Sequence, residues 1–297
     1  MEFIAAKGLL TPVRDDPAFF PRAYNLNLYR GCCHGCIYCD SRSVCYNLEH
    51  FERVRGKRDA LPLLEEELRR KRKPGIVATG AMSDPYNPFE AQYGLTRGAL
   101  ALLARFGFGA GLTTKSSLAA RDREALQAVR ERAPAYVTFS ITTLDEQLCA
   151  RIEPYASPTS QRFAALEQLS AAGLCTGVWI NPVLPFLTDS PDNLLGLVRR
   201  AADCGAQYVS CYFGMTLRAG SRDYYYQALD RCFPGLRAQY ERAYGNRYVC
   251  ECPEAWELWQ AYGQTCQALG LAYQMPDIRR RILRSQVQRQ VSLWEQL

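Results

Sequence analysis

The chain has 297 residues, of which 48% are hydrophobic and 22% are charged, and its formal net charge is +6. This composition is typical of a folded protein with a sizeable core and argues against intrinsic disorder. The sequence has no apolar run of the roughly 18 to 20 residues that cross a bilayer, and its first residues lack the pattern of a secretory signal. We therefore expect a cytoplasmic protein without membrane contacts, whose 13 cysteines stay reduced and form no disulfide framework.

From about residue 23 to residue 215, short apolar segments alternate with segments of helical periodicity. The apolar segments are mostly continuous, which is typical of strands in a parallel sheet covered on both faces. Ser190 and Pro191 have the pattern of a helix cap followed by the first helical residue. We predict strands at 23–31, 75–81, 109–116, 135–143, 175–185 and 207–215, and helices at 60–73, 96–107, 121–132, 161–173 and 191–205.

This order of elements predicts an α/β fold. Consecutive βα units that wind right-handedly curl into a partial (β/α)6 barrel, and an open doubly wound sheet is the competing solution. We divide the chain into a lead-in segment (1–22), a barrel core (23–217) and a mainly helical C-terminal cap with a basic tail (218–297). Apolar side chains recur at helical spacing in that tail and predict an amphipathic helix docked on the body: Ile278, Ile282, Leu283, Val287, Val291 and Trp294.

Residues that can carry chemistry follow the predicted strands. In such barrels the reacting groups lie where strands run into their following helices. Five cysteines fall within residues 28–46, directly after the first strand. Further candidates follow the later strands: Ser83, Asp84, Lys115, Ser140, Thr142 and Asn181.

Three of the clustered cysteines, Cys32, Cys36 and Cys39, are spaced C-x3-C-x2-C. Zinc sites usually have four protein ligands, often as two pairs. A [4Fe–4S] cube normally takes four thiolates, one for each iron. Three thiolates in one tight loop would leave one iron free to bind a small molecule that carries an amine and a carboxylate.

This motif, with the aromatic Tyr38 before its last cysteine, resembles that of the radical S-adenosylmethionine (radical SAM) enzymes. The resemblance extends to the spore photoproduct lyase-like branch of DNA-repair proteins, covers about residues 7–215, and rests on the segments 24–46, 79–90, 112–116, 139–154 and 177–185. It implies a TIM-like partial barrel, a [4Fe–4S] cluster, SAM, and a reductant such as flavodoxin or ferredoxin. The number of subunits is left open.

The resemblance also implies roles for individual residues. Cys32, Cys36 and Cys39 would ligate the cluster, and Tyr38 would lie near the adenine of SAM. Ser83 and Asp84 match the position that holds the methionine amine. Lys115 and Ser140 match positions that meet the carboxylate and the ribose.

The implied activity is reductive cleavage of SAM to a 5′-deoxyadenosyl radical that abstracts hydrogen from a substrate. That substrate stays open between a nucleic acid, a peptide and a small metabolite. Lesion repair of the spore photoproduct lyase type is an alternative, but residues 80–82 contain no hydrogen-donating thiol and Asp40 replaces the aromatic after the last cysteine. A non-catalytic iron–sulfur or zinc sensor is the alternative from a different class.

Other residues near these motifs have two interpretations each. We expect Cys33 to pack rather than to ligate, and Cys45 to be buried rather than to serve as a hydrogen donor. His34 either shapes the loop or donates a hydrogen bond toward the cluster.

The roles of two groups of residues farther along the chain are also left open. Glu153 and Arg162 form either a structural ion pair or a contact to SAM or substrate. The spacing of four later cysteines matches no trusted cluster pattern, although a second cluster there stays open: Cys232, Cys250, Cys252 and Cys266.

Overall fold

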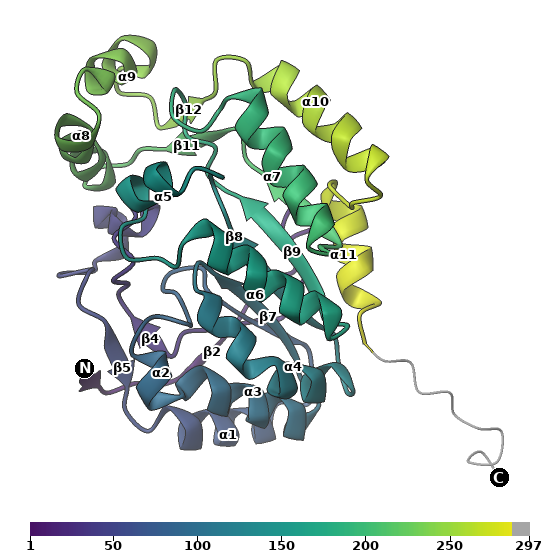
Figure 1. Ribbon diagram of the computed structural model, residues 1–297. Helices are drawn as coiled ribbons and strands as arrows, with labels where there is room; N and C mark the ends of the chain where they lie inside the picture. Colours follow the sequence, from purple (N-terminus) through teal and green to yellow (C-terminus); the bar gives the residue numbers. More distant parts are fainter. Residues whose placement is uncertain (287–297) are drawn as a thin grey trace.

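A seven-stranded sheet forms the centre of the protein in a computed structural model that describes residues 1–286. Its strand order is β10-β9-β8-β7-β6-β3-β2, and all neighbours are parallel except β2 and β3. The six parallel strands therefore follow one another in chain order (Figure 1). The strands are β2 (Leu10–Pro12), β3 (Tyr24–Leu26), β6 (Ile76–Thr79), β7 (Gly109–Thr114), β8 (Ala135–Ser140), β9 (Cys175–Ile180) and β10 (Tyr208–Cys211).

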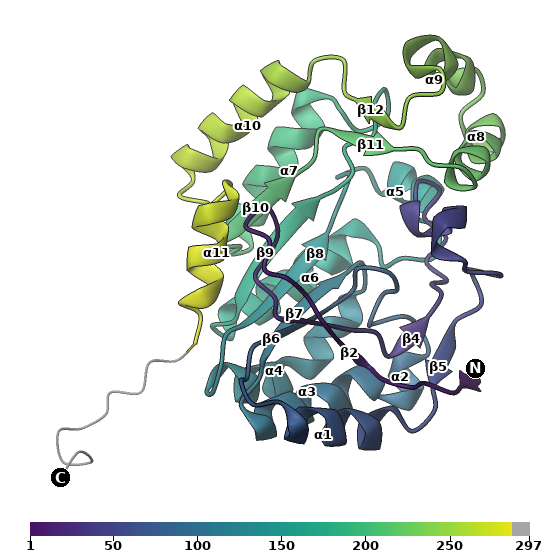
Figure 2. The ribbon, with the colours of Figure 1, turned by 180° about the vertical axis from the view of Figure 1, so that it is seen from behind.

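This order confirms the predicted partial (β/α)6 barrel and excludes the doubly wound sheet, in which the order reverses at a switch point. Because each right-handed crossover continues in the same direction, the connecting helices lie on one face of the sheet (Figure 1). The opposite face is crossed by the N-terminal segment (Figure 2). The main crossover helices are α1 (Ala60–Arg70), α3 (Leu95–Phe106), α4 (Arg123–Arg130), α6 (Thr159–Ala171) and α7 (Pro191–Asp203).

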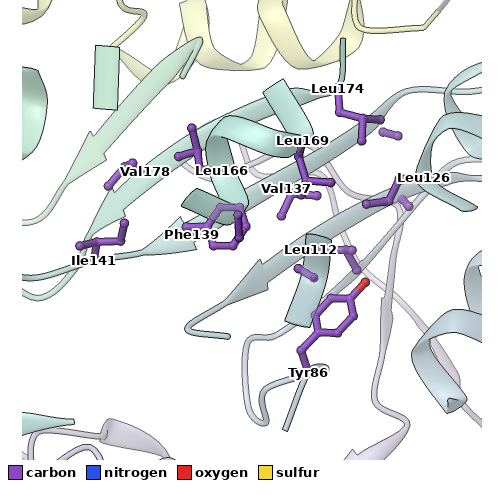
Figure 3. Packing of buried hydrophobic residues seen from close by; sticks show 14 of the residues in the cluster. Tyr86, Leu112, Leu126, Val137, Phe139, Ile141, Leu166, Leu169, Leu174 and Val178 are labelled. Carbon is purple, nitrogen blue, oxygen red and sulfur yellow. The ribbon is translucent and has the colours of Figure 1, made fainter. Parts of the chain in front are cut away.

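The main core lies between the sheet and these helices. Alternate strand residues such as Val137 and Phe139 of β8 point toward α6, where Leu166 and Leu169 meet them (Figure 3). The intervening residues of β8 are Tyr136, Thr138 and Ser140, and they face the inside of the partial barrel. This alternation separates a helix-covered core from an inner face that can hold a site.

Aromatic rings fill the lower part of the inner face. Phe20, Tyr136 and Tyr208 form one buried cluster, and the Tyr208 hydroxyl lies 2.7 Å from the Thr138 hydroxyl. A Cβ atom on Gly177 would lie 2.1 Å from the Tyr208 ring, so this position of β9 must be glycine. The cluster closes the amino-terminal end of the barrel and leaves the carboxyl-terminal end open.

The N-terminal region differs from the prediction. The predicted strand at 23–31 is broken: β3 ends at Leu26, and the chain continues into β4 (Tyr29–Arg30) of a separate three-stranded sheet with β1 (Glu2–Ile4) and β5 (Arg55–Lys57). The Glu67 carboxylate fixes the lead-in segment by accepting hydrogen bonds from the amides of Leu9 and Leu10 at 2.9 and 2.7 Å. Short helices add to the connections: α2 (Glu90–Tyr93), α5 (Glu146–Ile152) and 3-10 turns at Asp40–Arg42, Val44–Tyr46 and Ser117–Asp122.

Up to residue 286, where the described structure ends, the C-terminal region contains a two-stranded sheet and four helices. The elements are β11 (Gly214–Thr216), α8 (Ser221–Cys232), α9 (Leu236–Tyr244), β12 (Val249–Glu251), α10 (Ala255–Ala268) and α11 (Met275–Leu283). Ile278 and Ile282 of α11 are buried against the aromatic cluster, whereas Leu283 is 51% exposed. Val287, Val291 and Trp294 of the predicted tail helix lie outside the described residues. The domain boundaries remain a prediction.

The Ser190 side chain caps α7 by accepting a hydrogen bond from the Asn193 amide, and Pro191 begins the helix, as predicted. Within residues 1–286, no helix combines the length and the apolar character needed to cross a membrane.

We expect Ile282→Ala to lower the free energy of unfolding by about 2–5 kcal/mol, because it leaves a cavity where α11 meets the aromatic cluster. Leu283→Ala is the matched control on the same helix and should change stability by less than about 0.5 kcal/mol. Chemical denaturation of the two variants measures both values. An equal loss of stability in the two variants would show that the buried side chain of Ile282 contributes no more to folding than the exposed Leu283.

Candidate functional site

A pocket opens at the carboxyl ends of the parallel strands. Its cavity volume is about 240 Å³. All eight residues predicted for the cluster and for SAM line this pocket: Cys32, Cys36, Tyr38, Cys39, Ser83, Asp84, Lys115 and Ser140. They come from four separate segments: the loops that follow β4, β6 and β7, and the last residue of β8.

Two glycines give the cysteine loop its shape. Gly31 and Gly35 have φ angles of +83° and +72°, which side chains rarely adopt. A Cβ atom on Gly31 would also lie 2.6 Å from the carbonyl oxygen of Phe51, and one on Gly35 would lie 2.8 Å from the Tyr155 ring. The loop therefore packs tightly against two other segments of the chain.

The loop presents three thiols to the pocket. Burial raises the pKa of Cys32 to about 12, and it raises the pKa of Cys36 well above the ordinary value of a thiol. Both side chains are thus neutral thiols at pH 7 and lose their protons only when a metal replaces them. Cys33 is partly buried and packs against the main core, in agreement with the packing role expected for it.

Asp84 is held by the chain itself. Its Oδ1 atom accepts hydrogen bonds from the Tyr86 amide at 2.8 Å and the Thr114 hydroxyl at 2.7 Å, and its Oδ2 atom accepts one from the Lys115 amide at 2.8 Å. The neighbouring Ser83 is also buried, but its hydroxyl has no hydrogen-bond partner among the described residues. Asp84 thus fixes the loop after β6, and Ser83 is the member of the pair that can accept a ligand.

His34 is buried beside this loop, with its Nδ1 atom 3.4 Å from Asp84 Oδ2. Burial lowers the pKa of His34 despite the nearby carboxylate, so the imidazole is neutral at pH 7. Of the two roles considered for His34, contact with Asp84 favours the one in which it shapes the loop.

Lys115 and Ser140 meet across the ends of β7 and β8. The Lys115 ammonium donates a hydrogen bond of 2.5 Å to the Ser140 hydroxyl and lies 5.7 Å from the centre of the Tyr38 ring. A cation and a hydroxyl from neighbouring strands therefore form one wall of the pocket, next to the cysteine loop.

Glu153 and Arg162 form a fully buried ion pair behind this wall, with 2.5 Å between the Arg162 Nη2 and Glu153 Oε2 atoms. The other carboxylate oxygen accepts hydrogen bonds from the hydroxyls of Tyr38 and Thr142. Lys115 Nζ lies 3.8 Å from the same oxygen. Burial by itself would raise the pKa of Glu153, but Arg162, Lys115 and the Tyr38 hydrogen bond lower it to about 2. Glu153 is therefore ionised at pH 7.

The sequence did not single out the far side of the pocket. This side is lined by Asn181, which was among the predicted candidates, and by four residues that were not: Trp179 of β9, Tyr212 and Met215 after β10, and Phe51. The alternation of side chains along β9 could have identified Trp179. Val178 and Ile180 are buried in the core, so residues 177, 179 and 181 must face the other side. Tyr212 and Phe51 lie in loops, where no periodicity marks them.

The expected burial of Cys45 is wrong. Cys45 is exposed and lies in the 3-10 turn Val44–Tyr46, next to the exposed Val44. Its sulfur atom is 3.3 Å from the Ser43 hydroxyl and 3.5 Å from Arg218 Nη1. A turn of three residues at the surface has no face that could cover this thiol.

The later cysteines divide between separate apolar clusters. Cys250 packs with the C-terminal helices α8 and α9, whereas Cys252 and Cys266 belong to the main core. Within residues 1–286, no three His, Cys, Asp or Glu side chains are gathered as ligands of a single metal ion.

Comparison with known proteins identifies the class. Residues 26–202 match the family model of the radical SAM superfamily. An uncharacterised protein of Mycobacterium tuberculosis is 34% identical over 249 residues, which are 81% of this chain and 72% of the relative. An uncharacterised protein of Methanocaldococcus jannaschii is 29% identical over 59% of this chain and 66% of its own length. The chain therefore belongs to the radical SAM superfamily.

Solved structures share the fold at low sequence identity. Spore photoproduct lyase in complex with a dinucleoside spore photoproduct has a TM-score of 0.67 at 15% identity, over 92% of this chain and 81% of the lyase. The radical SAM methyltransferase TsrM of Kitasatospora setae, with tryptophan substrate and a SAM analogue bound, has a TM-score of 0.54 at 13% identity, over 82% of this chain and 51% of TsrM.

Family membership establishes the general activity. The protein is a radical SAM enzyme that uses a [4Fe–4S] cluster and SAM, and it needs a reductant. Its substrate and the type of reaction it carries out on that substrate are not defined by the family.

We expect Asp84→Asn to destabilise the cluster-free protein by about 1–3 kcal/mol, because an amide nitrogen cannot accept the hydrogen bonds that one carboxylate oxygen accepts now. Ser83→Ala is the matched neighbour and should change stability little, since its hydroxyl has no partner to lose among the described residues. Thermal unfolding without cluster or SAM separates the two. Equal stability of the variants would contradict the structural role of Asp84.

Proposed function

We propose that Cys32, Cys36 and Cys39 hold the [4Fe–4S] cluster and that Ser83, Lys115, Ser140 and Tyr38 bind SAM beside it. The observation that carries this proposal is the meeting of these side chains from four chain segments around one pocket. Asp84 belongs to the same site as a support, because its oxygens already accept hydrogen bonds from the chain.

The donor groups fit both cofactors. Three thiols from one loop match a cluster with one iron left free for SAM. The amino-acid part of SAM carries an ammonium and a carboxylate, for which the free Ser83 hydroxyl and the Lys115–Ser140 pair are suitable partners. The aromatic ring of Tyr38 lies next to Lys115 and offers a flat surface to the adenine.

When the cluster is bound and reduced, it supplies the electron that cleaves SAM to methionine and a 5′-deoxyadenosyl radical, which then abstracts hydrogen from the substrate. The chain's own part is to orient SAM and to exclude competing reactions. Cys36, Tyr38, Ser83 and Ser140 are all buried, so the inner part of the pocket is shielded from bulk water.

We expect Cys36→Ala to abolish the cluster absorbance after oxygen-free reconstitution, and with it the formation of 5′-deoxyadenosine from SAM on reduction. Cys33→Ala is the matched control from the same loop and should retain both, because Cys33 packs against the core. Iron content and product chromatography measure the two effects. Wild-type protein that held zinc, or a Cys36→Ala variant with full iron content, would contradict the proposal.

For the substrate, we propose a base of a nucleic acid. Trp179, Tyr212 and Asn181 support this choice, since two flat aromatic side chains and an amide can stack on a base and bond its edge. The solved spore photoproduct lyase holds a dinucleoside lesion. Here, however, Gly80, Ala81 and Met82 line the pocket in place of a thiol-bearing loop, so the proposal does not extend to repair by that enzyme's route.

We expect single-stranded nucleic acid to bind with an affinity that falls steeply with salt, because phosphate contacts release counterions. Trp179→Ala should weaken this binding by about 1–3 kcal/mol through the loss of one stacking surface. Trp256→Ala is the control, since Trp256 is 63% exposed on α10. Fluorescence anisotropy across a salt series measures all three. An affinity that does not change with salt, or an equal loss of affinity in Trp179→Ala and Trp256→Ala, would contradict the proposal of a nucleic-acid base as the substrate.

A further inference from the structure

Glu153 connects three parts of the site that come from different segments. Its Oε1 atom accepts the hydrogen bond of Tyr38, which lies between two cysteines of the cluster motif, and lies 3.8 Å from the Lys115 ammonium at the end of β7. Its Oε2 atom bonds Arg162. Arg162 in turn donates to the carbonyl oxygen of Ser140, at the end of β8, at 2.8 Å.

Most of these groups are enclosed by protein, and Lys115 is partly exposed. Glu153 and Arg162 are essentially without solvent exposure, and Tyr38 and Ser140 are buried. A buried charge is tolerated only when paired and hydrogen-bonded, and this carboxylate satisfies the condition with both oxygens. A carboxylate held so completely has little freedom to move, so the groups bonded to it are held as well.

We infer that Glu153 is a positioning residue for SAM: its carboxylate holds the Tyr38 ring and the Lys115 ammonium at the spacing that SAM requires. This role rests on the proposed binding site and extends it to a residue outside the pocket lining. The Tyr38 hydroxyl points away to Glu153, which leaves the ring for the nucleotide. Glu153 and Ser140 together fix the position of the Lys115 cation.

A second consequence concerns charge. SAM carries two positive groups and one negative group, so its net charge is positive. Loss of the negative charge of Glu153 therefore weakens the electrostatic attraction between the site and SAM. The same loss favours the reduced cluster, because the additional electron then meets less negative charge nearby. SAM affinity and cluster potential therefore report on Glu153 separately.

Two conservative variants separate positioning from simple neutralisation of Arg162. Glu153→Asp keeps the charge but is one methylene shorter, so it cannot contact Arg162, Tyr38 and Lys115 together. Tyr38→Phe removes one hydrogen bond and leaves the Glu153–Arg162 pair complete, so it avoids an unpaired buried charge. We expect each to weaken SAM binding by the reconstituted enzyme about tenfold, the effect of one lost charged hydrogen bond.

The cluster potential adds an independent measurement. Glu153→Asp should leave the midpoint potential near that of wild type because the charge is retained, whereas Glu153→Gln should shift it to a more positive value. Equilibrium dialysis with labelled SAM and a redox titration followed by electron paramagnetic resonance measure the two quantities.

Glu90 provides a matched control. It is fully buried and bonds a tyrosine hydroxyl (Tyr29) and an arginine (Arg121), as Glu153 does, but it belongs to α2 and lies outside the pocket lining. Glu90→Asp should lower the unfolding midpoint without changing SAM affinity.

Wild-type SAM affinity in both Glu153→Asp and Tyr38→Phe would overturn the positioning role and leave the proposed function intact, as would an equal loss of affinity in Glu90→Asp. Wild-type enzyme that bound its cluster but no SAM would overturn the proposed site and the role of Glu153 together.

Discussion

The strict alternation of side chains along parallel strands is the constraint on which the structure depends. Each strand must give one face to the helices and the other to the inside of the partial barrel. In β8, Val137 and Phe139 complete the outer core, while Tyr136, Thr138 and Ser140 form successive levels of the inner face. Because all six parallel strands run the same way, their last inner residues meet at one open end, and the site can form only there.

The polar groups at that end are organised by compensation of charge. Backbone amides and a hydroxyl donate hydrogen bonds to the Asp84 carboxylate, and the cations of Arg162 and Lys115 balance the charge of Glu153. The chain's own bonds therefore account for both of these buried carboxylates. The Ser83 hydroxyl, which has no partner in residues 1–286, and the Lys115 cation are left to face the pocket. A site of this kind is rigid before its ligand arrives, which reduces the entropy lost on binding.

The sequence predicted the parts of the molecule that local pattern controls. The Ser190 cap and the positions of the barrel strands, apart from the break in the first one, follow from periodicity and turn residues. The eight residues predicted for the cluster and SAM follow from the cysteine spacing and from the resemblance to the radical SAM enzymes. The three-stranded sheet of β1, β5 and β4 was not predicted, because its strands have two or three residues each and their paired residues are 25 to 53 positions apart. The exposure of Cys45 and the partners of Glu153 likewise depend on tertiary packing, which no local pattern records.

The same alternation explains how one fold can accept different substrates. Spore photoproduct lyase and TsrM share this fold at identities of 15% and 13%, so the fold alone does not select a substrate. In this chain, Trp179 can be exchanged without disturbing the outer core, because its neighbours Val178 and Ile180 supply the packing on the other face of β9. On the same inner face, Gly177 and Tyr208 are fixed by their mutual packing, so Trp179 near the carboxyl end of β9 has more freedom to vary than the residues below it.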